Sequence, residues 1–377
     1  MKYVAYYDTP DNKAEGRSYQ LSAANKIDYI CSVLNRLGKD VLIVSASVTE
    51  NKTGCNGKTV FLSAHTSLKL FPCLGMGSLP KRIVRRILGR LRLLNELVLH
   101  TKKGETVLVY HSLAYAGTIA LARKLKNFRL VLEVEEVYAD VSGNERDRSW
   151  EYRLFAQADA FLFPTELLNR RVNTGHKPYA IIHGTYQAEA DCGPKLFGNE
   201  KIHCVYAGTF DPRKGGAAAA AAAAKYLNEN YHIHILGFGS DEEVKQMQTL
   251  IEDLSGKCAC GISYDGLLSG QDYIRFLQSC HIGLSTQNPE AAFNATSFPS
   301  KILSYMANGL QVVSIRIPAV ETSAVGDRVS YYDRQTPEEI AKAIASVDMN
   351  PGEDPRRVME GLNCSFTQKL EELLGDL

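Results

Sequence analysis

Long hydrophobic runs are missing from this sequence, which excludes one large class of proteins. No uninterrupted apolar stretch in its 377 residues reaches the roughly 18 residues that a membrane-spanning helix needs. Residues 1–8 lack the layout of a signal peptide and are predicted to form a first strand. With 45% hydrophobic and 23% charged residues, the composition is that of a soluble globular protein, which we expect in the cytoplasm.

Metal-binding and disulfide patterns are also absent. The nine cysteines are scattered and odd in number. The two closest, Cys258 and Cys260, lack the two-residue gap of a zinc ribbon and have no matching second pair. We therefore expect reduced thiols in the protein core and no metal site.

Net charge is nearly absent, at +1, but one segment is strongly basic. Residues 80–103 hold eight basic residues and one acid, Glu96, and their apolar residues recur at helical spacing. Two interpretations remain open. The segment is either a surface helix with one face in the core and a solvated basic face, or a helix over 81–100 that docks on an anionic membrane or a phosphate-bearing acceptor.

Most of the chain alternates between apolar strand patterns and helical patterns. Such alternation predicts an α/β fold with doubly wound parallel sheets, and the length suffices for two domains with separate cores. A polar segment at 183–201 interrupts the pattern and is predicted to link the two. We expect domains at 1–190 and 191–350, then a helix within 351–377 that packs back on the first domain. A ligand cleft is expected at the carboxyl ends of the strands.

Two segments of the second domain are suited to bind phosphate. The first, 208–216, follows a predicted strand and precedes an alanine-rich helix, with Arg213 and Lys214 at the helix start. Taken alone, it is also compatible with a solvated loop. In the second, Ser300 and Lys301 open a helix that follows a proline and ends at a glycine. Cations and free N–H groups at helix starts attract anions, so the pair of segments predicts a diphosphate site.

In order and spacing, these segments resemble the GT-B glycosyltransferases, in particular the family 4 of retaining enzymes. The resemblance covers nearly the whole chain and is carried by short stretches at 150–166, 208–215, 235–239, 264–285 and 305–313. It implies two Rossmann-like domains that face a central cleft, with a nucleotide sugar bound by the second. The donor-binding residues that it implies are Gly208, Thr209, Arg213, Lys214, Gly237, Phe298, Pro299, Ser300, Lys301 and Ser304.

The sequence departs from the family pattern at three positions. Thr296 and Ser304 stand where the family has two glutamates, the second of which holds the donor ribose. Thr209 replaces an arginine, which leaves Lys214 as the matching phosphate-binding cation. The turn at 298–301 is similar to the Ser/Pro-x-Lys turn of a smaller branch of bacterial polysaccharide glycosyltransferases.

The first domain would supply the acceptor side. Gly16 and Arg17 lie in the loop where the family places a glycine-rich segment near the donor phosphates. Glu135 and Glu136 follow a strand and would orient or deprotonate an acceptor hydroxyl, unless they are only a solvated strand end. His111 ends the preceding strand and is either a third catalytic candidate or a structural histidine.

The resemblance implies transfer of a hexose, with retention, from a nucleoside diphosphate sugar to a hydroxyl of a glycan or lipid-linked acceptor. We expect uridine as the base and a role in surface polysaccharide or glycoconjugate synthesis. Lys214, Ser300 and Lys301 would stabilise the leaving diphosphate without a metal or another cofactor. A non-catalytic GT-B partner subunit and a GT-B sugar-nucleotide epimerase are the alternatives. Peripheral attachment to the inner face of the membrane is expected, and a nucleic-acid partner is not.

Overall fold

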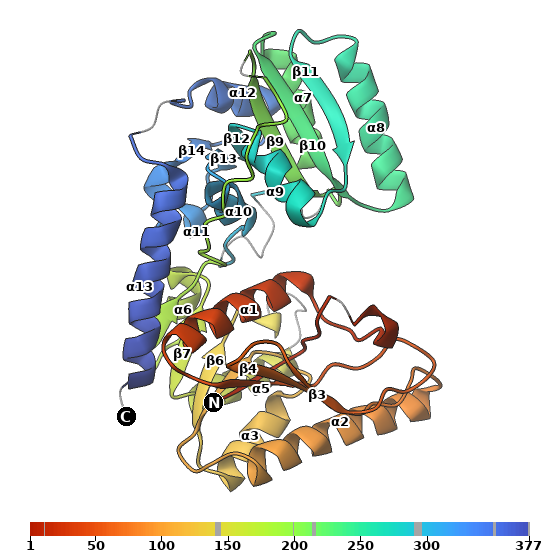
Figure 1. Ribbon diagram of the computed structural model, residues 1–377, viewed down its shortest axis with the longest axis vertical. Coiled ribbons are helices and arrows are strands. Elements are labelled where there is room, and N and C mark those ends of the chain that lie inside the picture. Colours follow the sequence, from red (N-terminus) through yellow and green to blue (C-terminus); the bar gives the residue numbers. More distant parts are fainter. Residues whose placement is uncertain are drawn as a thin grey trace. The chain divides into compact units, whose positions relative to one another are not determined.

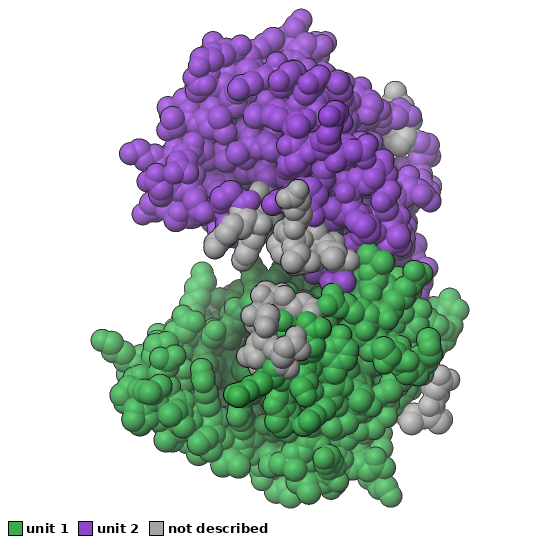
Figure 2. Space-filling view, turned by 180° about the vertical axis from the view of Figure 1, so that it is seen from behind, with its two compact units in different colours: residues 1–182, 366–377 green, residues 183–365 purple. Residues whose placement is uncertain are grey.

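The chain divides into two compact units, which Figure 2 colours separately. The first consists of Met1–Ile182 with Phe366–Leu377, and the second of His183–Ser365. The division lies slightly before the expected boundary at residue 190. The computed structural model describes residues 1–10, 12–139, 145–198, 200–212, 216–289, 296–349 and 352–375.

The first unit is built on an eight-stranded sheet in the order β3-β4-β2-β1-β5-β6-β7-β8 (Figure 1). Neighbouring strands are parallel, except that β3 pairs antiparallel with β4 at the edge. The central strands are largely buried, in keeping with their nearly continuous apolar sequences. The strands are β1 (Lys2–Ala5), β2 (Val41–Ser45), β3 (Lys58–Phe61), β4 (Thr66–Leu70), β5 (Thr106–Tyr110), β6 (Arg129–Glu133), β7 (Ala160–Phe163) and β8 (Tyr179–Ile181).

Helices cover both faces of this sheet, with α1 on one face and α2 and α3 on the other (Figure 1). On α1, Ile27, Ile30 and Leu34 form a buried stripe at helical spacing. The helix α6 begins at an N-cap threonine, Thr165, whose hydroxyl accepts a hydrogen bond from the Leu168 amide at 3.1 Å. The helices are η1 (Lys13–Glu15), α1 (Leu21–Arg36), α2 (Leu79–Leu99), α3 (Ala116–Leu125), α5 (Glu145–Gln157) and α6 (Glu166–Val172).

The second unit has a six-stranded, all-parallel sheet in the order β11-β10-β9-β12-β13-β14. Its strands are β9 (Ile202–Thr209), β10 (Tyr231–Phe238), β11 (Gly261–Gly266), β12 (Ile282–Ser285), β13 (Gln311–Ile315) and β14 (Val329–Tyr332). Its helices are α7 (Ala217–Ala222), η2 (Ala223–Tyr226), α8 (Asp241–Ser255), α9 (Gly270–Gln278), α10 (Lys301–Ala307), α11 (Pro318–Glu321), η4 (Gly326–Arg328) and α12 (Pro337–Ala345). The predicted α/β fold with two doubly wound parallel sheets is therefore confirmed.

The strand orders define where each sheet changes direction. In the second unit β9 lies between β10 and β12, and in the first unit β1 lies between β2 and β5. From each of these central strands the chain winds first to one side and later to the other. Ligands of open α/β sheets bind at the carboxyl ends of the strands next to such a switch point. Two places in the chain, one in each unit, are thus set by topology as candidate sites.

The last helix, α13 (Pro355–Gly375), is shared between the units. At its start, Arg356 donates to the Asn308 carbonyl of the second unit at 3.0 Å. Further along, the Phe366 ring stacks on Tyr29 of α1 at 6.0 Å between centroids. Residues of this helix from Phe366 onward thus pack on the first unit.

The cysteines are less buried than the sequence predicts. Cys31, Cys204, Cys260 and Cys280 are buried thiols, as expected of core residues. The others are partly or fully exposed, and this part of the expectation is wrong because they lie in loops or at helix surfaces. These are Cys55, Cys73, Cys192, Cys258 and Cys364.

Four histidines stack together in the second unit. His203 of β9 lies 5.2 Å from His234 of β10 between ring centroids, and His232 and His281 stack against the same group. A hydrogen bond of 2.9 Å joins His203 Nδ1 and His234 Nε2. Burial, together with the neighbouring imidazoles, lowers the pKa of His203 and His232 to about 4 each. These rings are therefore neutral in the folded protein at neutral pH.

This cluster should make the second unit sensitive to acid. The unfolded chain binds protons at these histidines near pH 6.5, whereas the folded chain binds them near pH 4, so stability is lost as the pH falls between the two values. The loss is at most about 1.4 kcal/mol per pH unit for each histidine. Urea denaturation at several pH values should show a shallower acid loss in His232→Gln than in the wild type. The exposed His65→Gln serves as control, and an equally steep loss in both variants would assign the effect to other groups.

Candidate functional site

The helix α10 is fixed against the switch point of the second sheet by one buried tyrosine. The Tyr305 hydroxyl accepts a hydrogen bond from the Ala207 amide of β9 at 2.9 Å and donates to the Leu284 carbonyl of β12 at 3.3 Å. Its ring lies so close to Gly283 that a Cβ at that position would come within 2.2 Å of it. Because glycine permits this approach, the first residues of α10 stand beside the strands next to the switch point.

Lys301 is the first residue of α10 and carries the charge of the site. Its ammonium nitrogen lies 4.2 Å from the centroid of the Tyr206 ring. A Cβ on Gly208 would lie 3.1 Å from the same nitrogen, so the lysine reaches the end of β9. Across the described part of the chain, no carboxylate forms an ion pair with it. Burial without a counter-charge lowers the pKa of Lys301 to about 8 and leaves an ammonium group that an anion would stabilise.

The three residues before Lys301 differ in burial, since the first is packed in the protein and the last is exposed. Phe298 is buried and stacks on His183 at 4.7 Å between ring centroids. Pro299 lies just before the helix, and its carbonyl accepts a hydrogen bond from the Ile302 amide at 3.1 Å. The Ser300 side chain is exposed and makes no capping hydrogen bond, so its hydroxyl is not used by the helix itself.

Ser304 lies one turn further along α10. Ser304 is half-buried. Burial raises the pKa of the Tyr273 phenol of α9, and a hydrogen bond with the Ser304 side chain acts against this rise. Its carbonyl accepts a hydrogen bond from the Asn308 side chain at 2.8 Å. Its predicted contact with a donor ribose stays a prediction.

The loops that follow β9 and β12 are tied to each other. The Thr286 hydroxyl donates to the Gly216 carbonyl at 2.9 Å, and a Cβ on Gly216 would lie only 1.4 Å from the Thr286 carbonyl oxygen. The β9 and β10 backbones meet similarly at Gly208 and Gly237. Thr209 accepts a hydrogen bond at its hydroxyl from the Asp211 amide at 3.1 Å. The predicted residues Arg213 and Lys214 lie outside the described residues.

Gln287 is a polar residue of this site that the sequence pattern did not single out. It is buried just after β12, and its side-chain oxygen accepts from the Ser285 hydroxyl at 2.9 Å. Its amide nitrogen has no hydrogen-bond partner among the residues described. Buried donors are nearly always satisfied, so this amide is available to a ligand. The polar triplet Ser285–Gln287 at a buried strand end was the signal in the sequence.

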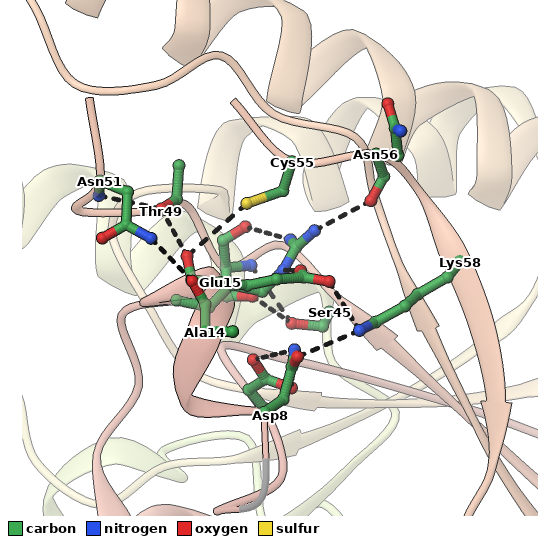
Figure 3. Close-up of polar contacts among 12 residues, drawn as sticks. Asp8, Ala14, Glu15, Ser45, Thr49, Asn51, Cys55, Asn56 and Lys58 are labelled. Carbon is green, nitrogen blue, oxygen red and sulfur yellow. Dashed lines mark hydrogen bonds and ion pairs between the residues drawn. The ribbon is translucent and has the colours of Figure 1, made fainter. Parts of the chain in front are cut away.

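In the first unit, Arg17 is engaged by the protein itself. Its guanidinium is buried and donates to Glu15 at 2.6 Å and to the Ser47 and Asn56 carbonyls at 3.3 Å each. Glu15 also pairs with Lys58 at 2.6 Å, and Figure 3 shows this network between the loop before α1 and the segment before β3.

The preceding residue, Gly16, has a left-handed conformation with φ of 51°. A Cβ there would lie 2.8 Å from the Asn51 side-chain oxygen. Both residues of the predicted phosphate loop are thus part of a packed, hydrogen-bonded turn. Their contact with donor phosphate stays a prediction.

Glu135 belongs to a buried charge cluster whose other members the sequence pattern did not reveal. Lys26 of α1 lies 2.5 Å from Glu135 Oε1, donates to the Ile182 carbonyl at 3.0 Å, and lies 3.8 Å from Glu133 Oε1. Glu133 is fully buried and accepts a hydrogen bond from the Tyr3 hydroxyl. Burial raises the pKa of Glu133 to about 7, although the Lys26 charge acts against this rise. Glu135 is consequently held by an ion pair.

His111 and Glu136 differ in their surroundings. Only 1% of His111 is exposed, and its Nε2 lies 2.8 Å from the buried carboxylate of Glu151. Glu151 also accepts hydrogen bonds from the Tyr138 and Ala139 amides at 2.8 Å each. Glu136 is half-buried; burial and, after it, the nearby charge of Glu136 raise the pKa of the Tyr138 phenol. The catalytic roles of both residues stay predictions.

A pocket of about 210 Å³ lies at the switch point of the first sheet. It is formed where β1, β2 and β5 end and α1 begins, and none of its lining side chains is charged. No sequence motif marks it, because its residues come from separate segments. Its phenol and hydroxyl groups come from Tyr6, Ser18, Tyr19, Tyr110, Ser112 and Tyr138.

The described residues contain neither a metal-binding cluster nor a membrane-spanning helix. No group of three or more His, Cys, Asp or Glu side chains is arranged to hold a metal ion there. Among the described helices, none combines the length and apolar character needed to cross a bilayer.

The second unit matches a known family, and the whole chain matches known structures. Residues 201–348 match the family of glycosyl transferases group 1. The sequence matches none of the curated proteins with which it was compared. A trehalose-6-phosphate protein from E. coli, bound with UDP-2-fluoro glucose, superimposes with a TM-score of 0.69 at 11% identity, over 100% of this chain and 98% of that chain.

Two further structures give similar values. The UDP-forming α,α-trehalose-phosphate synthase from Burkholderia xenovorans, in complex with glucose-6-phosphate, has a TM-score of 0.64 at 11% identity and covers 100% and 99% of the two chains. HepE from Anabaena, in complex with UDP and glucose, has a TM-score of 0.63 at 10% identity and the same coverage. The chain therefore has the expected GT-B fold, and its second unit carries the match to glycosyl transferases group 1.

Proposed function

We propose that the protein is a retaining glycosyltransferase that moves a sugar from a UDP-sugar to a hydroxyl of a glycan or lipid-linked acceptor. The observation that carries this proposal is Lys301, an ammonium group at the carboxyl end of β9 that has no counter-ion among the described residues, with the exposed Ser300 hydroxyl beside it. Two structures of the same fold hold UDP or a UDP-sugar, which supports uridine as the base. Surface polysaccharide or glycoconjugate synthesis is the proposed setting.

The chemistry follows from the charge of the leaving group. Transfer breaks the bond between the anomeric carbon and a diphosphate oxygen, and negative charge develops on that oxygen. Lys301 and Ser300 would hold the diphosphate there and lower the barrier by stabilising this charge. The Gln287 amide, which has no hydrogen-bond partner in the described part of the chain, would donate a further hydrogen bond to the sugar nucleotide. The proposed reaction draws its positive charge from lysine and needs no metal ion.

The pocket at the end of the first sheet is the proposed acceptor site. Sugars present apolar ring faces and hydroxyl edges, which match phenol rings and the hydroxyls of Ser18 and Ser112. Because no lining residue is charged, the proposed acceptor group is a neutral sugar. Glu136 is not among the residues that line this pocket, but it is half-buried near Tyr138, which is, and we propose that its carboxylate orients the acceptor hydroxyl.

Nucleotide release in the presence of different acceptors tests the proposal. Purified protein would be incubated with UDP-, GDP-, ADP- and dTDP-sugars, each with free monosaccharides and with lipid-linked sugars, and nucleotide release followed. Release of UDP that requires an acceptor is the expected result. Binding of UDP-sugar without release under all conditions would instead favour the non-catalytic partner subunit, and isomerisation of the sugar would favour the epimerase. Absence of any nucleotide binding would overturn the proposal.

We propose further that α2 docks on an anionic membrane. The sequence left open whether the apolar residues of this helix lie in the core. In the structure Ile83, Ile87 and Leu91 are 49%, 51% and 55% exposed, and only Leu93, Glu96 and Leu97 are buried. The first half of α2 thus presents apolar side chains to solvent. Such a surface fits the interface of a bilayer, provided that its charges are complementary.

The basic residues of α2 supply that complementarity. Arg85 and Arg92 donate to backbone carbonyls of the first unit, which orients the helix. Lys81, Arg82 and Arg86 form no ion pair with the described carboxylates and remain free to meet lipid phosphates. An apolar pocket of about 490 Å³ lies alongside, where α2 meets α3 and α5, and is partly lined by a half-exposed tryptophan. Tryptophan is typical of membrane interfaces.

Removal of two of these cations should weaken binding to anionic vesicles. Each basic residue near such a surface contributes about 1 kcal/mol, so Arg82→Ala with Arg86→Ala should lower vesicle affinity by roughly 30-fold. Flotation with vesicles of increasing phosphatidylserine content measures this. The matched control replaces Lys102 and Lys103, two cations beyond the end of the helix. Flotation that is indifferent to anionic lipid would refute the membrane role.

A further inference from the structure

Two cysteines face each other across a pair of loop segments in the first unit. Cys55 donates its amide hydrogen to the Cys73 carbonyl at 2.9 Å, and Cys73 donates to the Cys55 carbonyl at 2.9 Å. Residues that exchange both hydrogen bonds in an antiparallel pair have Cα atoms about 5.5 Å apart. That separation lies within the range found for disulfides. Neither cysteine forms a disulfide in the structure, and both are partly exposed.

The backbone on the Asn51–Met76 side of the cysteines holds the two segments at this distance. The Met76 amide donates to the Asn51 carbonyl at 2.7 Å, which adds a third backbone hydrogen bond between the two segments. Two glycines allow close approach, since a Cβ on Gly54 would lie 2.6 Å from the Cys73 carbonyl oxygen and one on Gly75 would lie 2.1 Å from the carbonyl oxygen of residue 52. The cysteine pair is therefore set by fixed backbone contacts.

We propose that Cys55 and Cys73 form a reversible disulfide, a redox-controlled staple between the segments 51–57 and 72–76. The oxidant is a low-molecular-weight disulfide such as oxidised glutathione. One thiolate attacks it and forms a mixed disulfide with release of one thiol, and the second thiolate then displaces the other thiol. The protein loses two electrons and two protons, and the small disulfide is reduced to two thiols.

The pairing geometry makes this bond one that is easily reduced again. Directly opposite, hydrogen-bonded residues hold their Cβ atoms further apart than a relaxed disulfide does, so the bond is strained. Strained and exposed disulfides have more oxidising potentials and are the labile ones. A staple between Cys55 and Cys73 should therefore respond to the ratio of reduced to oxidised glutathione, whereas the buried Cys204 and Cys280 should not react.

The staple would act on the loop that precedes α1. The Cys55 thiol donates to the Glu15 carbonyl at 3.6 Å, and the Thr49 hydroxyl donates to the same carbonyl at 2.5 Å (Figure 3). Arg17 of that loop donates to the Asn56 carbonyl. Oxidation removes the Cys55 S–H and so ends its hydrogen bond to the Glu15 carbonyl. At the same time it links the segment 51–57, to which the loop before α1 is hydrogen-bonded, to the segment 72–76. This inference does not depend on the proposed glycosyltransferase activity.

Peptide mapping of the full chain tests the staple. After equilibration in glutathione buffers and alkylation, digestion without reductant should yield one peptide in which Cys55 is linked to Cys73, lighter by two hydrogen atoms and separated by dithiothreitol. Hydrogen exchange in 51–57 and 72–76 should slow on oxidation. Cys55→Ser should abolish both effects, and Cys364→Ser, which removes an exposed cysteine elsewhere, should change neither.

Three results would overturn the inference. The first is mixed glutathione adducts on Cys55 or Cys73 without the linked peptide. The second is a linkage of either residue to a different cysteine or to a second chain. The third is slower exchange that persists in Cys55→Ser. Because serine is close to cysteine in size, an unchanged melting temperature of reduced Cys55→Ser would show that the variant folds.

Discussion

Replacement of Lys301 by alanine should lower the rate of UDP release from a UDP-sugar by roughly 10²–10³-fold, the effect of removing one group that stabilises developing negative charge. The reason lies in the position of its ammonium group, which faces Tyr206 beside Gly208 and has no carboxylate partner among the described residues. The variant should fold normally, because a half-buried charge without a counter-ion does not stabilise the folded state. Steady-state kinetics and a thermal melt check both expectations.

The pH profile gives an independent test of the same residue. Because the pKa of Lys301 is lowered to about 8, its charge is present below that pH and is lost as the pH rises through it. Nucleotide affinity should therefore fall on the alkaline side, and Lys301→Arg should move that fall to higher pH, since arginine keeps its charge. The exposed Lys225→Ala, in the same unit, is the matched control. Unchanged release in Lys301→Ala would remove the basis of the proposed donor site.

Loss of Lys26 should destabilise the first unit by about 3–5 kcal/mol at pH 8, as expected when one partner of a buried ion pair is removed. In Lys26→Met, the carboxylates of Glu133 and Glu135 would remain without their cation, and Glu133 is fully buried. Methionine retains the length of the lysine stem, so the lost charge dominates the effect. Urea denaturation followed by far-UV circular dichroism measures the change.

Protonation of Glu133 should relieve much of this loss at lower pH. Its pKa of about 7 lies above that of an unfolded glutamate, so the folded state binds this proton more tightly. Stability attributable to Glu133 is consequently complete below about pH 4.5 and decreases as the pH rises through 7. The penalty of Lys26→Met should shrink from pH 8 to pH 5, and the double variant with Glu133→Gln should recover most of it at pH 8. Equal losses at both pH values, without recovery, would contradict this account.

Some elements were not predictable from local patterns for identifiable reasons. No strand was predicted at β3 and β4 (Lys58–Phe61 and Thr66–Leu70), although alternate residues of β4 are buried. All four residues of β3 are exposed, its two apolar residues Val60 and Phe61 included, so only the antiparallel pairing with β4 makes this short segment a strand. The alanine-rich stretch is an α-helix only over Ala217–Ala222 and continues as a 3-10 helix over Ala223–Tyr226.

The sequence by itself determined the alternating α/β architecture and the helix start at Ser300–Lys301. Both depend on residues that are close in sequence. The spacing of apolar residues specifies strands and helices, and a proline and a glycine mark where a helix starts and ends. Tertiary structure decided which charged side chains have hydrogen-bond or ion-pair partners within the protein. It bound Arg17 to the Ser47 and Asn56 carbonyls, paired Lys26 with Glu133 and Glu135, and left Lys301 without a carboxylate among the described residues. Such partners come from distant segments, and only the folded chain brings them within the few ångströms over which hydrogen bonds and ion pairs act.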